Sequence, residues 1–169
     1  SALRFLLRIA LLFVLVPTLA AVKNILKGYD EGDRSIPDYV IEKSRRVFDR
    51  HIAATKMYYS AGGRIAMGTD AGTPHNRHGE NARELEYMCD IGVSARDSLF
   101  FATASAADLM RLDDQGRIKE GNSADLVLCD GDALGDIKRA ARKENHRLVV
   151  KRGQVARDNR AAFVREPAR

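Results

Sequence analysis

Short apolar runs and longer amphipathic stretches alternate along the first half of the chain. A continuous apolar run at 12–16 is typical of a buried strand, and a second run covers 64–70. Between them, apolar residues recur at helical spacing after Pro37, with charged residues opposite, until the pair Gly62-Gly63. This pattern predicts an amphipathic helix between two buried strands.

Two more helices are expected after the second strand. The first begins at about Glu80 and ends at Gly92. The second starts after Ser94, with Asp97 three residues on as its capping-box partner, and continues to about Leu112. The resulting order of strand, helix, strand, helix, helix favours a parallel sheet or barrel of the α/β class.

The pattern changes after residue 112. Segments 116–121 and 124–129 are short apolar stretches separated by Gly and Asp, and both predict strands. The stretch 147–156 predicts a hairpin that turns at Arg152-Gly153. A small β element is therefore expected to follow the α/β part.

Three segments with different roles are predicted: an α/β part at 1–112, a β-sandwich segment at 113–160 and a basic tail at 161–169. Residues 138–169 hold 11 Lys and Arg against 3 Asp and Glu, a balance of +8 within a net charge of +5. Phe163 is the one aromatic residue there, so the segment has no stacking platform for bases. A solvated surface is favoured, and no nucleic-acid partner is expected.

The first 22 residues have two interpretations. Arg4 and Arg8 precede an apolar run and small residues follow, as in a secretory signal. The same run, at Leu12–Val16, also fits a buried strand. Arg8 and Pro17 interrupt it, so no membrane span is expected. The two cysteines form no disulfide framework, which favours a reducing cytoplasmic location and leaves a secreted one open; the oligomeric state is not indicated.

Asp70 is the first candidate for chemistry. It directly follows an apolar strand, and in α/β barrels the carboxyl ends of the strands carry the active site. The alternative is a carboxylate that only caps a turn or the next helix. His75 and His78 form a His-x-x-His pair in the following loop, a weak metal-binding pattern that is also common among loop histidines without a function.

Several segments, in the same order, resemble the amidohydrolase superfamily, and within it the imidazolonepropionase-like and Xaa-Pro-dipeptidase-like hydrolases. They are Gly68-Thr-Asp-Ala-Gly-Thr-Pro74 with His78-Gly79 and Glu84-Leu85, the alanine-rich stretch 102–107, the stretch 116–127 and the stretch 14–19. The resemblance implies a (β/α)8 barrel followed by part of a small β-sandwich, with this chain as the C-terminal part.

The resemblance also implies a function. Asp70 matches the aspartate at the end of the eighth barrel strand, which ligates a divalent metal, often zinc, and transfers a proton. His78 would line the substrate pocket. The implied activity is metal-dependent hydrolysis of carbon–nitrogen bonds in small molecules, such as amides, cyclic amides or Xaa-Pro dipeptides.

The sequence departs from the family at the metal site. The family's His-x-His pair, bridging lysine and two further histidines should lie before residue 14, where this sequence does not contain them. One carboxylate cannot complete a zinc site. We therefore expect a C-terminal fragment that is inactive alone. The alternative is a non-catalytic truncated product or a basic-tailed binding module, and the metal content of the purified chain separates the two.

Overall fold

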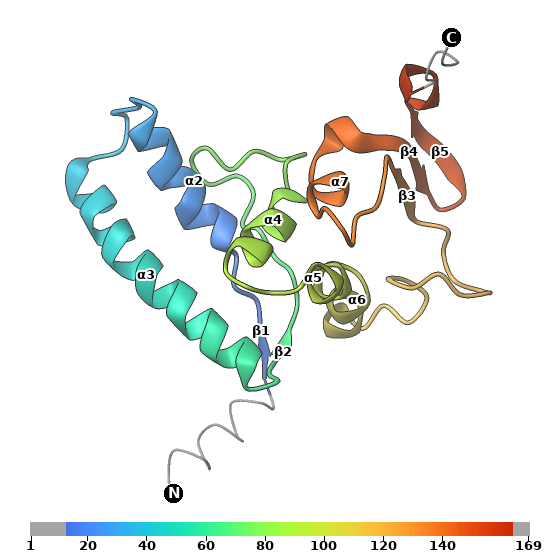
Figure 1. Ribbon diagram of the computed structural model, residues 1–169, viewed down its shortest axis with the longest axis horizontal. Coiled ribbons are helices and arrows are strands. Elements are labelled where there is room, and N and C mark those ends of the chain that lie inside the picture. The colour runs from blue at the N-terminus through green and yellow to red at the C-terminus, as the bar shows by residue number, and fades with distance from the viewer. Residues whose placement is uncertain (1–12, 164–169) are drawn as a thin grey trace, which may run out of the picture.

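The computed structural model describes residues 13–163, arranged as Figure 1 shows. Helices and short strands alternate in its first part, and a small sheet forms most of its last part. The elements are, in chain order, β1 (Val14–Leu15), α2 (Leu19–Asp30), α3 (Asp38–Ser60), β2 (Arg64–Ile65), α4 (Arg83–Asp90), α5 (Ala95–Ala102), α6 (Ala104–Met110), β3 (Leu126–Cys129), α7 (Lys138–Ala141), the 3-10 helix η1 (Lys143–Asn145), β4 (His146–Lys151), β5 (Gln154–Asp158) and the 3-10 helix η2 (Arg160–Phe163).

Strands β1 and β2 pair in parallel, and helices α2 and α3 form the connection between them. Val14 is aligned with Arg64 and Leu15 with Ile65, and the N–H of Ala66 donates to the carbonyl oxygen of Leu15 at 3.0 Å. The strand interpretation of the first apolar run is thus confirmed at Val14–Leu15. Leu12 and the signal-like pattern in 1–12 lie outside the described residues.

The amphipathic helix and the Ser94 cap are confirmed. Helix α3 starts after Pro37 and ends before the glycine pair, and the Ser94 hydroxyl accepts the N–H of Asp97 at the start of α5. Helix α2 was not predicted as a helix. Its N-cap residue, Thr18, has a left-handed backbone (φ 48°) and no side-chain cap hydrogen bond, so no local side chain caps the start of this helix.

The single helix predicted from Ser94 to Leu112 is divided at Thr103, which separates α5 from α6. The Phe101 carbonyl, which an unbroken helix would use internally, accepts the N–H of Met67 at 2.9 Å. The Ser105 hydroxyl donates to the carbonyl of Ile65 at 2.5 Å. The break therefore docks these two helices onto β2 and its extension.

The small sheet has the antiparallel order β3-β4-β5, and the hairpin at Arg152-Gly153 is confirmed. The prediction of a strand at 116–121 was wrong, because this segment forms turns. The Arg117 guanidinium binds the Asp108 carboxylate on α6 through both nitrogens, at 2.9 and 2.8 Å. The Ser123 N–H donates to the Asp114 carbonyl instead of to a neighbouring strand.

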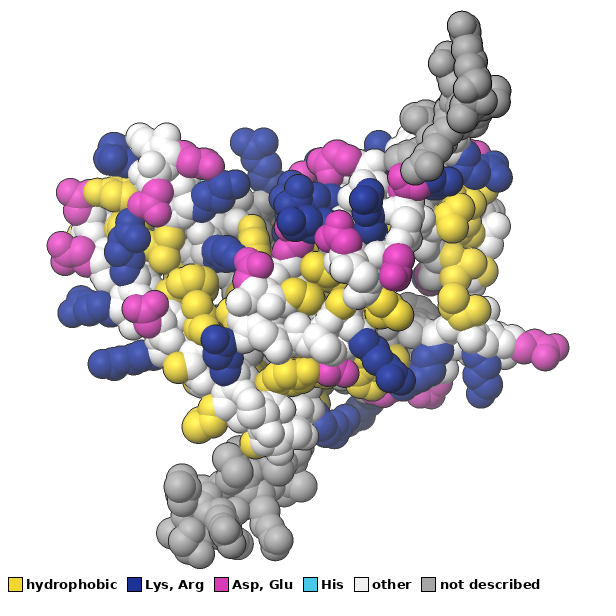
Figure 2. Space-filling view, in the orientation of Figure 1, with side chains coloured by type: hydrophobic (Ala, Val, Ile, Leu, Met, Phe, Trp, Pro, Cys, Tyr) yellow, Lys and Arg dark blue, Asp and Glu magenta, His cyan; other side chains and the backbone are white. Residues whose placement is uncertain are grey.

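The core lies between α2 to α5 and the parallel strands. Its centre is formed by buried residues of five segments, namely Leu19, Ile65, Met88, Ile91, Val93 and Phe101. The β3–β5 sheet is not covered in this way, and Figure 2 shows hydrophobic side chains over it. Leu126, Val127 and Leu128 are 40 to 52% exposed, and a groove of about 620 Å³ lies between this sheet and helices α4 and α5. Among the described residues, no helix is long and apolar enough to cross a membrane.

We predict that Gly68→Ala destabilises the chain by about 1 kcal/mol or more, because overpacking forces neighbouring groups apart. A Cβ at residue 68 would lie 2.5 Å from Cγ1 of Val16. Urea unfolding measures the effect. The double variant Gly68→Ala/Val16→Ala should recover most of the loss relative to Val16→Ala, since the clashing methyl group is then gone. Equal midpoints for Gly68→Ala and wild type would contradict the close approach.

Candidate functional site

Asp70 lies where the extension of β2 turns into the loop 70–79. Residues 65, 66 and 69 are buried, whereas Asp70 itself is exposed. Its backbone is left-handed, with φ 48°, and its carbonyl accepts the N–H of Thr73 at 3.3 Å and the Thr73 hydroxyl at 3.1 Å. The backbone thus forms a closed turn, and the carboxylate has no hydrogen bond or ion pair within residues 13–163.

The loop that follows Asp70 is held by one buried side chain, Asn76, which is 2% exposed. Its amide nitrogen donates to the carbonyl of Thr69 at 2.5 Å and to the hydroxyl of Thr73 at 3.3 Å. Its backbone carbonyl accepts the N–H of Gly72 at 2.8 Å. Asn76 therefore closes the loop from inside and fixes the peptide immediately before Asp70.

The two loop histidines point to different partners. The Nε2 atom of His75 lies 2.6 Å from Oδ2 of Asp33. The pKa of Asp33 is lowered by the N–H and hydroxyl of Ser35 and then by His75. His78 is exposed, with its Nε2 next to Gly72. The His-x-x-His spacing thus does not produce a pair in this structure.

Glu84 is a buried residue to which the sequence analysis gave no role. It is 0% exposed, and its Oε1 and Oε2 accept the N–H groups of Leu19 and Ala20 at 2.8 and 2.7 Å. It therefore supplies from α4 the cap that α2 lacks locally. A signal existed: Glu84 stands one and two turns before the core residues Met88 and Ile91, and an acidic residue on an apolar stripe requires a buried partner.

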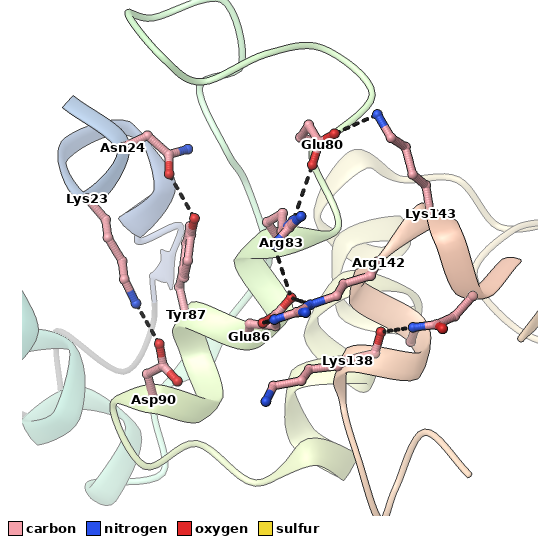
Figure 3. Close-up of polar contacts among 12 residues, drawn as sticks. Lys23, Asn24, Glu80, Arg83, Glu86, Tyr87, Asp90, Lys138, Arg142 and Lys143 are labelled. Carbon is pink, nitrogen blue, oxygen red and sulfur yellow. Dashed lines mark hydrogen bonds and ion pairs between the residues drawn. The ribbon is translucent and has the colours of Figure 1, made fainter. Parts of the chain in front are cut away.

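Helix α4 contacts the molecule on two sides, as Figure 3 shows. On one side Tyr87 donates its hydroxyl to Asn24 on α2 at 2.8 Å. On the other, the Glu86 carboxylate accepts two hydrogen bonds from Arg142, both at 2.9 Å. Lys143 binds Glu80 just before the helix. Helix α4 thus connects α2 to the C-terminal segment that carries α7.

Burial raises the pKa of the Glu84 carboxyl to about 7. The N–H groups of Leu19 and Ala20 and the charge of Lys23 oppose this shift, and the charge of Asp70 adds to it. The two carboxylates thus have opposite surroundings. Glu84 is buried and hydrogen-bonded, whereas Asp70 faces solvent.

The described part of the chain does not contain a complete metal centre. No group of three or more His, Cys, Asp or Glu side chains that could hold a metal ion occurs within residues 13–163. A zinc site takes four ligands, of which at least three usually come from the protein. Asp70 could supply one ligand, so the donors present in this part do not fit the whole site.

The comparisons with known proteins agree on one family. The model of the amidohydrolase family matches residues 16–156, whereas a search of the curated proteins finds no match. The family match runs from the end of β1 through β2 and most of the small sheet, and it confirms the resemblance seen in the sequence.

Solved structures give the same result. The chain resembles an Xaa-Pro dipeptidase with bound methionine (32% identity, TM-score 0.72), covering 84% of this chain and 34% of that one. It also resembles a prolidase complexed with N-methylphosphonate-L-proline, with 26% identity and a TM-score of 0.74 over 85% of this chain and 34% of that one. The A. niger ochratoxinase is similar with 25% identity and a TM-score of 0.70 over 86% of this chain and 33% of that one. The chain thus spans about a third of the length of these structures, and the predicted barrel-derived fold class is confirmed.

We predict that the Glu84 carboxyl titrates near pH 7 rather than at its ordinary value of 4.5. Between these values the unfolded chain releases the proton and the folded chain keeps it. The contribution of Glu84 to stability is thus fully present below about pH 4.5 and is lost as the pH rises through 7. The loss is about 3 kcal/mol.

The 13C signal of the Glu84 carboxyl measures the midpoint directly. The free energy of unfolding of wild type relative to Glu84→Gln, followed against pH, measures the linked loss, because Gln does not titrate. A midpoint near 4.5 and a pH-independent difference would show that burial does not dominate.

Proposed function

The chain belongs to the amidohydrolase family, and we propose from this that it forms the Asp70-bearing part of a metal-dependent hydrolase that cleaves carbon–nitrogen bonds. The observation that supports this most directly is the position of Asp70. It is an exposed carboxylate without a partner among the described residues, held on a closed turn at the carboxyl end of a parallel strand. In α/β barrels the active site lies at that end of the strands.

Asp70 would act as a metal ligand and as the group that transfers a proton. An exposed carboxylate can accept a proton from the attacking water at one Oδ atom and return it to the leaving amine. A divalent metal, for which zinc is our proposal, would lower the pKa of bound water. Asp70 is one ligand, and the described residues do not provide the others.

The proposed substrates are small amides, with Xaa-Pro dipeptides and cyclic amides as the two classes. Similarity to an Xaa-Pro dipeptidase and to a prolidase supports the first class. His78, in the loop beyond Asp70 and beside Gly72, is the proposed substrate-binding residue. Its position on the loop, rather than at a strand end, suits a contact with substrate better than metal ligation.

We propose that this chain does not hydrolyse amides by itself. One ligand cannot hold the metal, and the β3–β5 sheet leaves apolar side chains exposed. The activity test is therefore made on an assembled enzyme, in which this chain is co-produced with the N-terminal part of a prolidase from the same family. A non-catalytic chain would leave that assembly inactive.

We predict that Asp70→Asn in the assembled enzyme abolishes turnover of Xaa-Pro dipeptides while the fold is kept. Asn has nearly the same size but cannot take a proton, and general acid–base catalysis contributes about 10²–10⁴-fold in rate. Steady-state hydrolysis and circular dichroism of both forms measure the two effects. Wild-type turnover in Asp70→Asn would rule out the assignment of Asp70.

We predict that His78→Ala in the same assembly changes the preference between dipeptides and leaves the metal content unchanged. The measurement is kcat/KM over a series of Xaa-Pro dipeptides, together with elemental analysis. His75→Ala is the matched control, because His75 is bonded to Asp33 and should not alter preference. The loss of one metal equivalent in His78→Ala would instead identify His78 as a ligand.

A further inference from the structure

Helix α4 holds α2 through two side chains that lie one turn apart on the same face. Glu84, fully buried, accepts the N–H groups of Leu19 and Ala20. One turn later, the Tyr87 hydroxyl donates to the side-chain oxygen of Asn24, a contact that can be followed in Figure 3. The start of α2 and its second turn are thus both fixed by α4.

The contacts continue from α2 to the loop that carries Asp70. The side-chain nitrogen of Asn24 donates to the side-chain oxygen of Asn76 at 3.3 Å. Asn76 in turn donates to the carbonyl of Thr69 at 2.5 Å, and Thr69 is joined directly to Asp70. A continuous series of hydrogen bonds therefore runs from α4, through α2, to the peptide that precedes the proposed catalytic carboxylate.

We propose that Glu84 is a positioning residue: by capping α2 from α4 it fixes the helix whose Asn24 supports Asn76, and thereby the backbone position of Asp70. The contact of Glu84 with α2 stands on the geometry alone. Its consequence for metal binding and turnover rests on the function proposed for Asp70.

A side chain with two acceptor oxygens suits this place because two backbone donors converge on it. Both of its oxygens accept, whereas Gln has one acceptor oxygen and an NH2 group that would face the second N–H. Leu19 and Ala20 are 1% and 2% exposed, so water does not replace the lost acceptor. Glu84→Gln thus removes one hydrogen bond at nearly constant volume.

Glu86→Gln is the matched control. It makes the same chemical change two residues further along α4, on the side facing Arg142 instead of α2. It weakens the connection to the C-terminal segment and leaves the cap of α2 intact. A loss of exchange protection or of zinc affinity that comes from general weakening of α4 would appear in both variants.

The first measurement is amide hydrogen exchange on the 169-residue chain, at a pH where the Glu84 carboxyl is charged. The rates at Leu19 and Ala20 are expressed relative to Ala66, whose N–H is bonded to Leu15 within the sheet. We expect at least about tenfold faster relative exchange in Glu84→Gln and wild-type behaviour in Glu86→Gln. Unchanged exchange in Glu84→Gln, or equal changes in both variants, would overturn the proposal.

The second measurement uses the assembled enzyme with zinc. We expect Glu84→Gln to weaken zinc binding about tenfold, as substitutions of supporting residues around metal ligands do. We also expect kcat to fall with little change in KM, because the displaced group is Asp70 and not a substrate contact. Tyr87→Phe removes only the hydroxyl that donates to Asn24. It should change zinc affinity and kcat in the same direction, but by less.

The two measurements separate the possible failures. If the wild-type assembly neither binds zinc nor hydrolyses dipeptides, the proposed function is wrong, and the exchange rates still decide the role of Glu84. If Glu84→Gln does not fold, Tyr87→Phe replaces it, with exchange at Asn76 as the readout. Wild-type exchange at Asn76 and wild-type zinc affinity in Tyr87→Phe would then overturn the series of contacts.

Discussion

A buried carboxylate on two backbone N–H groups determines how the first part of the molecule is assembled. Leu19 and Ala20 begin α2 in the core, where water does not reach their N–H groups, and no local side chain caps the helix. Unpaired buried donors are costly, so α2 is stable there only with α4 docked against it. Because α5 follows α4 closely and its Phe101 carbonyl bonds Met67, this docking also locates the extension of β2.

The features that the sequence predicted correctly are those specified by neighbouring residues. Helix α3 has its apolar stripe within one stretch, and the cap of α5 uses Ser94 and Asp97, three residues apart. The features it missed depend on distant partners. The cap of α2 comes from a residue 65 positions away, and the break at Thr103 reflects bonds to the β2 region. Hydrophobic pattern alone carries no information about such partners.

The same distinction applies to the candidate site. Asp70 could be located because a carboxylate after an apolar strand has a fixed place in an α/β fold. The orientation of His75 could not, because it depends on α2 passing close by. A Cβ at Gly28 would lie 2.4 Å from the His75 ring. The ring can therefore lie against α2 and reach Asp33 only because residue 28 has no side chain. A spacing of three residues is compatible with two histidines on one metal, but the imidazole of His75 binds the nearby carboxylate of Asp33 instead.

Asp70 and Glu84 show how environment divides roles between two carboxylates. Glu84 is fully buried and hydrogen-bonded through both oxygens, so it suits fixing a backbone and has no access to a substrate. Asp70 is exposed, so it suits proton transfer but has nothing in its own side chain to keep it in place. Its left-handed backbone (φ 48°) is a conformation that L-residues adopt at a cost, and the bonds from Thr73 and Asn76 around it offset that cost. A reactive carboxylate that cannot anchor itself must be positioned by its backbone, and here the supports of that backbone lead back to the carboxylate that cannot react.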